Sequence, residues 1–343
     1  MRAGPLTVLI SSAGRRVELL RSFRRAVSQV APGGRVLAID SSWYSAAFHE
    51  ADAGFLVPRI SDPDHVPRLL EICEREGVDL IVPTTDREWP VWSTAIADFE
   101  AVGTTVAVSS PEVLAIASDK RRTNEWLTAN GFPTVRQCRP AEALADPDAW
   151  PLPLIAKPRF GSASEGVGLV RDRRELELVA ARDASGATLA DGRPGDLLVE
   201  TVAAGVEHTI DVLVDRSGLC LCAVPRRRLE VRGGEVSKGV TVRSPDLIEL
   251  AFGLAKALPG PYGVLNFQVF RDDDTGELAV IEINPRFGGG FPLSDAAGAD
   301  FPRWLLEDLL GLPSTADADG WRDGLVMLRY DAAVFVDRAE ALE

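Results

Sequence analysis

The stretch of residues 278–290 constrains this chain more than any other part of its sequence. An apolar run in its first half predicts a buried strand. Alternate side chains of a strand share one face, so Glu282, Asn284 and Arg286 are expected to project together, each about 6.6 Å from the next. A carboxylate, an amide oxygen and a guanidinium in a row suit a divalent cation and the phosphates it neutralises. A solvated face on an edge strand is the alternative. The apolar side chains of the run are Val280, Ile281 and Ile283.

A second strand is predicted at residues 265–270, joined to the first by a polar turn. If the hairpin folds near residue 274, the numbers of paired positions add up to about 550, which sets Gln268 opposite Glu282 with their Cβ atoms about 5 Å apart. Gln268, Glu282 and Asn284 then form a patch of three oxygen donors. Mg²⁺ typically takes only a few protein ligands of this kind and fills its shell with phosphate and water.

The overall charge excludes several classes of partner. The net charge is -14 and the isoelectric point about 4.8, which argues against binding to nucleic acid or to an anionic membrane. No apolar run approaches the roughly 20 residues that a membrane helix needs.

The four cysteines and three histidines show no spacing typical of a zinc site, a disulfide framework or a Ser-His-Asp triad. With no signal peptide at its start, the sequence predicts a cytoplasmic protein.

Lysine is rare in this chain. Of the 37 basic residues only four are lysines, at positions 120, 157, 238 and 256. Lysine is a compact charge on a flexible stem and does not replace the planar fork of arginine, so a retained lysine suggests a specific role. Lys256 lies in an ordinary helical context and is attributed to chance. The other three lie at a helix start, at the end of a short strand and near the end of a later strand.

Residues 1 to about 110 alternate strands with helices, a pattern typical of a parallel sheet covered on both faces. The three-glycine fingerprint is absent, so this Rossmann-like part is not expected to bind a dinucleotide. Ligands of such sheets lie at the carboxyl ends of the strands. The polar residues there either contact a substrate or are ordinary loop residues. They are Ser12, Arg15, Arg16, Asp40, Asp86 and Glu88.

The middle of the chain carries a second glycine-rich feature. A helix is predicted from residue 118 to 131, with a domain boundary near 111–118, and a short strand then ends at Lys157 and Pro158. The loop 159–168 that follows can wrap its N–H groups around phosphate oxygens, although it lacks the P-loop pattern and an ordinary hairpin tip is the alternative. Residues 183–195 predict a surface loop.

Taken in this order, the residues resemble the ATP-grasp superfamily, with the closest likeness to the branch of carbamoyl-phosphate synthetase large subunits and biotin carboxylases, as a single-module relative. The resemblance covers nearly the whole chain. It implies a fold of class α/β and α+β, the ATP-grasp fold with an N-terminal Rossmann-like domain. The implied domains are residues 1–115 (the Rossmann-like domain), 116–199 (the lid) and 200–343 (the C-terminal domain with the metal site).

The resemblance also implies a role for each motif. Gln268, Glu282 and Asn284 would hold Mg²⁺, with Mn²⁺ as a possible substitute. Arg286 would stabilise the transferring phosphoryl group, with Lys238 as a second catalytic residue. The residues expected to bind ATP are Lys120, Lys157, Gly161, Ser162, Ser164, Gly166, Glu200, Thr201, Val202 and Glu207. The candidates for substrate binding are Arg226, Arg228, Gly289 and Gly290, although the run of arginines at 226–228 reads equally well as a solvated strand edge.

The implied reaction activates a carboxylate. A small acid, expected to be an amino acid, would attack the γ-phosphate of ATP, and an amine would displace phosphate from the acyl phosphate. The alternatives are an enzyme that forms carbamoyl or carboxy phosphate and a non-catalytic ATP-binding regulatory subunit. No nucleic-acid or membrane partner is expected, a homodimer is compatible with the resemblance, and residues 120–200 are expected to open and close over ATP.

Overall fold

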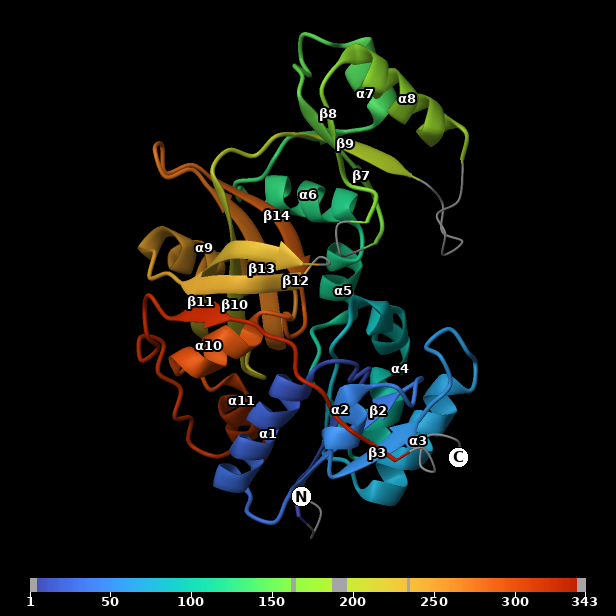
Figure 1. Cartoon of the computed structure of the whole chain (residues 1–343), viewed down its shortest axis with the longest axis vertical. Coiled ribbons are helices and arrows are strands. Elements are labelled where there is room, and N and C mark those ends of the chain that lie inside the picture. The colour runs from blue at the N-terminus through green and yellow to red at the C-terminus, as the bar shows by residue number, and fades with distance from the viewer. Residues whose placement is uncertain (1–4, 162–164, 187–195, 233–234, 338–343) are drawn as a thin grey trace.

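The computed structural model describes residues 5–161, 165–186, 196–232 and 235–337. Three sheets organise this part of the chain. Figure 1 shows the smallest of them, with two helices, at one end of the molecule and the first sheet at the other end. The largest sheet lies between them along the long axis. Among the described residues, no helix combines the length and the apolar character needed to cross a membrane.

The N-terminal sheet is parallel and has the strand order β3-β2-β1-β4-β5. Helices lie between the strands, as the alternating pattern predicted. The strands are β1 (Thr7–Ile10), β2 (Arg35–Asp40), β3 (Ala53–Leu56), β4 (Leu80–Val82) and β5 (Thr105–Val106). The helices of this part are α1 (Val17–Val30), α2 (Ala46–Glu50), α3 (His65–Glu76), the 3₁₀ turn η1 (Asp86–Glu88) and α4 (Trp89–Ala101). α5 (Pro111–Ala117) and α6 (Lys120–Ala129) then lead into the smallest sheet.

The smallest sheet, which we call the lid with its two helices, has the order β6-β9-β7-β8, and all its pairs are antiparallel. Its elements are β6 (Gln137–Cys138), α7 (Pro140–Ala145), β7 (Leu154–Pro158), β8 (Gly168–Val170), α8 (Arg173–Ala184) and β9 (Leu197–Thr201). The predicted loop 183–195 is wrong at its start, because α8 continues through Ala184, and most of the rest lies outside the described residues.

The C-terminal sheet has the order β14-β13-β10-β11-β12-β15, again with antiparallel pairs. Its strands are β10 (Val206–Val214), β11 (Cys220–Arg232), β12 (Glu235–Thr241), β13 (Gly263–Arg271), β14 (Leu278–Asn284) and β15 (Val326–Leu328). Its helices are α9 (Pro245–Ala257), α10 (Phe291–Ala297) and α11 (Phe301–Leu310). The architecture is the mixed one that the sequence predicted, a parallel sheet followed by two antiparallel ones.

The β13–β14 hairpin has the predicted register, with Gln268 opposite Glu282. The register shifts at the next pair, where Val269 lies opposite Val280, so Ile281 is the extra residue of a bulge. The sequence predicted Ile281 to be buried with Val280 and Ile283. That prediction is wrong for Ile281, which is only half-buried, because a bulge interrupts the alternation of the two faces.

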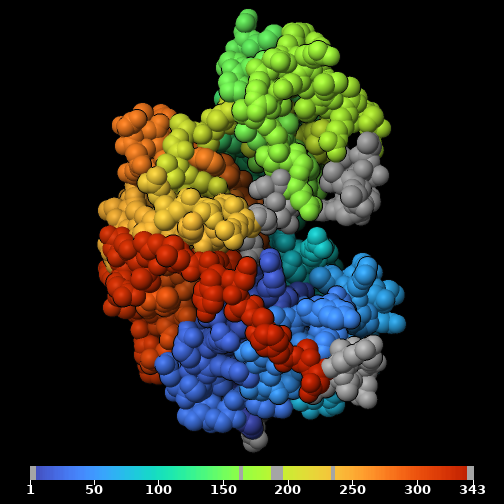
Figure 2. Space-filling view, viewed as in Figure 1, coloured from blue at the N-terminus to red at the C-terminus, as the bar shows by residue number. Residues whose placement is uncertain are grey.

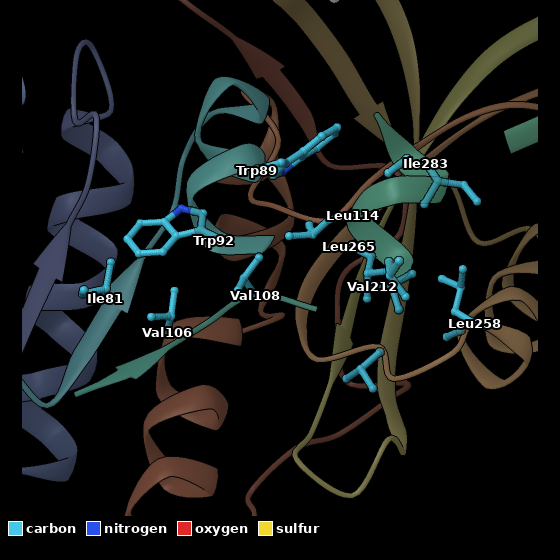
Figure 3. Close-up of a cluster of buried hydrophobic side chains, with 14 of the residues drawn as sticks. Ile81, Trp89, Trp92, Val106, Val108, Leu114, Val212, Leu258, Leu265 and Ile283 are labelled. Carbon is cyan, nitrogen blue, oxygen red and sulfur yellow. The ribbon is translucent and has the colours of Figure 1, made fainter. Parts of the chain in front are cut away.

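One apolar core joins the N-terminal sheet to the C-terminal sheet. Side chains of β4 and β5, the tryptophans of α4, Leu114 of α5 and side chains of β10 and β13 belong to a single buried cluster. Figure 3 shows Ile81, Trp92, Leu114 and Val212 one after another, from left to right, across this junction. A second contact is made by α1, which packs on α11 and on α10. Ser22 of α1 donates a hydrogen bond of 2.7 Å to Asp295 of α10. The two sheets are therefore held in a fixed relation.

The lid keeps a small core of its own. Its buried cluster is formed by residues of β6–β9, α7 and α8, and no described residue of the other two sheets belongs to it. Figure 2 shows the lid standing apart from the N-terminal part of the molecule, with a hollow between them. The side chains of the cluster are Cys138, Ala143, Leu154, Ala156, Val170, Leu176 and Val199.

Candidate active site

A cavity of about 660 Å³ lies where the three sheets meet. Loops after β1 and β4 form one wall, the lid forms another, and strands β10, β11, β13 and β14 form the floor. Most of the predicted site residues line it, namely Lys120, Lys157, Gly161, Glu200, Thr201, Val202, Glu207, Arg226, Arg228, Gln268, Glu282, Asn284, Arg286, Gly289 and Gly290. Gly166 and Lys238 do not line it, while Ser162 and Ser164 lie outside the described residues.

Two oxygen donors face each other on the floor of the cavity. Gln268 and Glu282 are directly paired positions of β13 and β14, and both side chains are half-buried. Within the described chain, neither side chain makes a hydrogen bond or an ion pair. A half-buried carboxylate normally acquires a partner, and a divalent cation bound by oxygen ligands would supply it. The buried Asn284 adds a third oxygen on the same strand. This donor set fits Mg²⁺.

Arg286 follows this patch immediately. Its Nη1 donates to the carbonyl oxygen of Phe287 at 3.2 Å, and its Nη2 lies 3.5 Å from Oδ1 of Asn284. Its Nε is buried and has no hydrogen-bond partner among the described atoms. A buried donor without a partner costs free energy, so the guanidinium is held ready for an anionic group that enters the cavity.

The lid and the start of α6 bring two lysines to the opposite wall. Asp119 caps α6 by accepting a hydrogen bond of 3.0 Å from the backbone N–H of Arg121, and Arg159, just beyond β7, pairs with Asp119 at 2.7 Å. Lys120 donates to the carbonyl oxygen of Gly161 at 2.5 Å. Burial lowers the pKa of Lys120, while the carboxylate of Glu282 opposes that shift. The ammonium group of Lys120 thus lies within electrostatic reach of the oxygen patch.

Lys157 is the second lysine and is almost wholly buried. Its Nζ lies 2.6 Å from Oε1 of Glu200, the same oxygen that accepts a hydrogen bond of 2.7 Å from Gln137. β7 and β9 are neighbouring strands, with Lys157 paired to Leu198 in the ladder. The lid sheet therefore fixes a buried cation at the cavity wall, beside the loop that begins at Gly161.

The remaining predicted nucleotide contacts lie where the lid joins the C-terminal sheet. Thr201 ends β9, and Val202 is exposed at the cavity. Glu207, on β10, forms an ion pair with Arg228 of the neighbouring strand β11. Both partners line the cavity, so Arg228 binds the carboxylate that was predicted to contact ribose.

The arginine run 226–228 lies inside β11 and alternates, as a strand requires. Arg226 is 2% exposed and holds Asp211 with two hydrogen bonds of 2.7 and 2.9 Å, whereas Arg227 points outward and is exposed. Asp211 also accepts hydrogen bonds from Asn266 at 2.8 Å and from Ser294 at 2.6 Å. A solvated edge is therefore wrong for Arg226, which is part of a buried polar network.

This network supports the glycine loop after Arg286. A Cβ atom on Gly290 would lie 2.1 Å from Nη1 of Arg226, and one on Gly288 would lie 2.8 Å from Nδ2 of Asn266. The backbone can follow this path only without side chains there. The buried ion pair of Arg226 and Asp211 therefore restricts the path of the loop that connects Arg286 to the first turn of α10.

Lys238 lies on β12, where its Nζ pairs with Glu230 at 2.6 Å. Its side chain is half exposed and does not line the cavity. Nothing in this position supports the catalytic role predicted for it, and we leave it out of the proposed mechanism.

One wall of the site contains residues whose role the sequence left open between a substrate contact and an ordinary loop. Arg15, Arg16 and Asp86, which follow predicted strands of the N-terminal part, line the cavity together with Thr84 and Thr85. The signal was present, because ligands of a parallel sheet lie at the carboxyl ends of its strands. Ser12, Asp40 and Glu88 do not line the cavity, and they hold these loops by hydrogen bonds.

Two protein families match different parts of this chain. Residues 8–107 match the family described as PylC-like, N-terminal domain. Residues 193–332 match the family described as ATP-grasp in the biosynthetic pathway with Ter operon. The first match covers the parallel sheet, and the second covers the C-terminal sheet that carries the oxygen patch.

Similar sequences include large chains of carbamoyl phosphate synthase. The N-terminal section of that chain from Methanopyrus kandleri is 25% identical over 262 residues, which cover 71% of this chain and 45% of the relative. The large chain from Thermotoga petrophila is 23% identical over 332 residues, covering 92% of this chain and 29% of the relative. The chain thus spans less than half the length of these curated relatives.

Solved structures show the same fold. The biotin carboxylase of Campylobacter jejuni, solved as its beta-gamma-ATP complex, has a TM-score of 0.75 at 17% identity, with 94% of this chain and 74% of that chain covered. The biotin carboxylase domain of Hydrogenobacter thermophilus 2-oxoglutarate carboxylase, solved with MgADP, ADP and bicarbonate, has a TM-score of 0.73 at 20% identity, with 94% and 74% covered. N5-carboxyaminoimidazole ribonucleotide synthetase from Thermotoga maritima has a TM-score of 0.63 at 18% identity, with 91% and 77% covered.

The solved structures and the family match over residues 193–332 together define an ATP-grasp fold. The chain is similar to ATP-grasp proteins over residues 193–332 and to PylC-like N-terminal domains over residues 8–107. The predicted resemblance and the predicted fold class are confirmed. The predicted domain boundaries at 115 and 199, and the role of each site residue, stay predictions.

Proposed function

We propose that this chain is an ATP-dependent ligase that joins a small carboxylic acid to an amine through an acyl phosphate. The observation that carries the proposal is the meeting of two unsatisfied groups in one cavity. Among the described residues, the side chains of Gln268 and Glu282 have no partner, and the buried Nε of Arg286 has no hydrogen-bond acceptor. ATP with its metal, and a carboxylate beside it, would satisfy both.

The ATP would lie between the lid and the C-terminal sheet. Lys120 and Lys157 would contact its phosphates from the lid side, and Glu200 with the backbone of Thr201 and Val202 would bind the adenine. Gln268, Glu282 and Asn284 would hold Mg²⁺, or Mn²⁺ in its place. When bound, the cation supplies positive charge that offsets the charge of the phosphates. The lid has a core of its own, which supports opening and closing of this part as ATP enters and ADP leaves.

The chemistry needs no protein nucleophile. A carboxylate oxygen of the acid attacks the γ-phosphorus, the bond to the bridging oxygen breaks, and ADP leaves. Arg286, beside the reacting group, stabilises the negative charge on the phosphoryl oxygens. The amine then attacks the acyl carbon and forms the C–N bond. The C–O bond breaks, and phosphate leaves with its electron pair. An arriving ammonium group gives up two protons in total, one that remains on phosphate near neutral pH and one released to water.

Release of ADP tests the proposal directly. A panel of carboxylic acids, amino acids first, is offered with ATP, Mg²⁺ and either an amine or hydroxylamine, which traps an acyl phosphate as a hydroxamate. Ligation predicts rapid ADP release only when acid and amine are both present, and a hydroxamate when hydroxylamine replaces the amine. ADP release with bicarbonate alone would instead favour a carboxy phosphate. ATP binding with no ADP from any pair would favour a regulatory subunit that binds ATP without turnover.

A further inference from the structure

The wall of the cavity that the N-terminal part supplies carries two charged side chains of opposite sign. Arg15 follows β1 and Asp86 follows β4, and both line the cavity. Throughout the described ranges, neither side chain takes part in an ion pair, although most other arginines of this acidic chain do. Asp86 accepts one hydrogen bond of 3.2 Å, from the hydroxyl of its neighbour Thr85. The wall therefore presents an unneutralised cation and an unneutralised anion to whatever occupies the cavity.

The two loops are fastened to each other beneath these side chains. Ser12 has a φ of 46°, a left-handed backbone that costs a serine about 1 kcal/mol or more. Its hydroxyl donates a hydrogen bond of 3.0 Å to Oε1 of Glu88, and Oε2 of Glu88 accepts one of 3.3 Å from the backbone N–H of Thr84. Glu88 is fully buried. Strain of this kind persists where a local geometry serves a function.

Further hydrogen bonds hold the loop that carries Arg15. The hydroxyl of Thr84 donates to the carbonyl oxygens of Ser11 and Ser12 at 2.9 and 2.8 Å. The backbone N–H of Gly14 donates to Asp40 at 2.9 Å. Arg15 and Asp86 therefore project from a rigid scaffold, and rigid placement of opposite charges is what recognition of a doubly charged ligand requires.

The position of Asp86 relates the wall to the reacting centre. Burial lowers the pKa of Lys120, and the carboxylates of Glu282, Glu200 and Asp86 all counteract that shift. Asp86 is thus within electrostatic reach of the lysine that we assign to the phosphates, on the side away from the lid. The oxygen patch and Arg286 take the phosphoryl group and the acid, so this wall is left for the second substrate.

We propose that the wall formed by Arg15 and Asp86 binds the amine substrate, and that this substrate is an amino acid whose ammonium group contacts Asp86 and whose carboxylate contacts Arg15. The inference rests on the proposed ligase function and specifies the class of its amine. Asp86 orients the nitrogen and accepts the first proton of the ammonium group. The free lone pair then attacks the acyl carbon and forms the C–N bond, while the C–O bond breaks with its electron pair on the leaving phosphate. The proton held by Asp86 passes to that phosphate, and the second proton passes to water.

The test compares two nucleophiles in the full-length protein. The proteinogenic amino acids are offered in pairs with ATP and Mg²⁺, and an active pair is then compared with the same acid plus hydroxylamine, which is too small to need the wall. In Asp86→Asn and Arg15→Gln, KM for the amino acid that serves as amine should rise at least about tenfold, since charged hydrogen bonds contribute roughly 1.5–3 kcal/mol. Hydroxamate formation and KM for ATP should stay within about twofold of the wild type.

Two control variants each remove one charge, a guanidinium or a carboxylate, from a residue outside the cavity. Arg87→Gln changes an exposed arginine next to Asp86, and Asp98→Asn changes an exposed carboxylate on α4, and neither residue lines the cavity. Both should leave KM for the amino acid unchanged. If the variants fold poorly, the test uses the wild-type protein. Its kcat/KM for the decarboxylated form of the accepted amino acid should be at least about tenfold lower than its kcat/KM for the amino acid itself.

Three results would overturn the inference. One is unchanged KM for the amino acid in both folded variants. Another is a decarboxylated amine that serves as well as the amino acid itself. Both would leave the ligase function standing, because ADP would still be released. No ADP and no hydroxamate from any pair would overturn the ligase function and this subsite together.

Discussion

Glu282 lies directly opposite Gln268 across β13 and β14, and neither side chain has a partner among the residues that the structure describes. Two oxygen donors held at paired positions of neighbouring strands cannot relax away from each other without breaking the ladder. Their geometry is therefore set by the backbone and not by their own interactions. This pair is the most direct structural argument for a cation at the floor of the cavity.

Removal of the carboxylate should abolish turnover and leave the fold intact. Glu282→Ala is expected to lower the rate of ADP release by roughly a hundredfold or more, since the phosphates would lose a stabilising cation. The free energy of unfolding should change little, because Glu282 makes no ion pair in the described structure. The measurement is ADP release as a function of Mg²⁺ concentration. Glu277→Ala, on the exposed turn of the same hairpin, is the control. Full activity in Glu282→Ala would contradict the metal assignment.

The buried pair of Lys157 and Glu200 links stability to nucleotide binding. Lys157→Met leaves a buried carboxylate without its cation and should lower the free energy of unfolding by about 3–5 kcal/mol. Replacing both residues, as Lys157→Met with Glu200→Gln, should restore most of that loss, because no buried charge remains. ATP affinity should stay low in the double variant. Chemical denaturation and ATP titration of the three proteins distinguish the two effects, and recovery of ATP binding in the double variant would refute the role of Lys157.

The glycine loop after Arg286 should not tolerate a side chain. Gly290→Ala would place a Cβ atom 2.1 Å from Nη1 of the buried Arg226, so the ion pair with Asp211 or the loop must move. We expect a loss of about 1–3 kcal/mol in the free energy of unfolding and a lower rate of ADP release. Gly253→Ala is the control, since its new Cβ would meet only Phe132, at 3.5 Å, and a helix favours alanine. Equal stability of both variants would argue against the close contact.

Glu88 should make stability depend on pH near neutrality. Burial raises the pKa of Glu88 from 4.5 to about 7, so the folded state retains a proton that the unfolded state loses. The stabilisation is fully present below pH 4.5 and is lost as the pH rises through 7. Glu88→Gln has no charge to bury, and its one amide oxygen still accepts a hydrogen bond from either Ser12 or Thr84. It should therefore gain on the order of 1–3 kcal/mol relative to the wild type between pH 5 and pH 8.

Urea denaturation at those two pH values measures this difference. Glu100→Gln, an exposed position of α4, is the control and should follow the wild type at both values. An equal change for Glu88→Gln and Glu100→Gln would mean that the buried carboxyl does not titrate in this range.

Local patterns predicted the floor of the site well. The turn near residue 274 and the alternation of the flanking strands place Gln268 opposite Glu282, because the register of a hairpin depends on residues close in sequence. The bulge at Ile281 was missed, since an extra residue leaves no mark in a period of two. The pairing of Lys238 with Glu230 was missed for a similar reason, because it depends on irregular pairing of β11 with β12.

The wall made by Arg15 and Asp86 could not be placed from sequence alone. Its position at the cavity depends on how the N-terminal sheet packs on the C-terminal sheet. That packing is set by apolar side chains such as Trp92 and Val212, which lie far apart along the chain. Sequence patterns fix which residues end a strand, and tertiary packing decides which of those ends faces the ligand.

The shared core of the first and last sheets also affects how the chain acquires its structure during synthesis. The lid is encoded between two halves that bury their apolar surfaces against each other. On the ribosome, the N-terminal sheet emerges first, and the apolar side chains of α4 and α5 in this shared core lack their partners on β10 and β13 until the strand ending at Arg271 has been made. The lid, whose apolar core consists of its own residues, can form that core earlier. The middle of the chain is therefore positioned to fold before its beginning is complete.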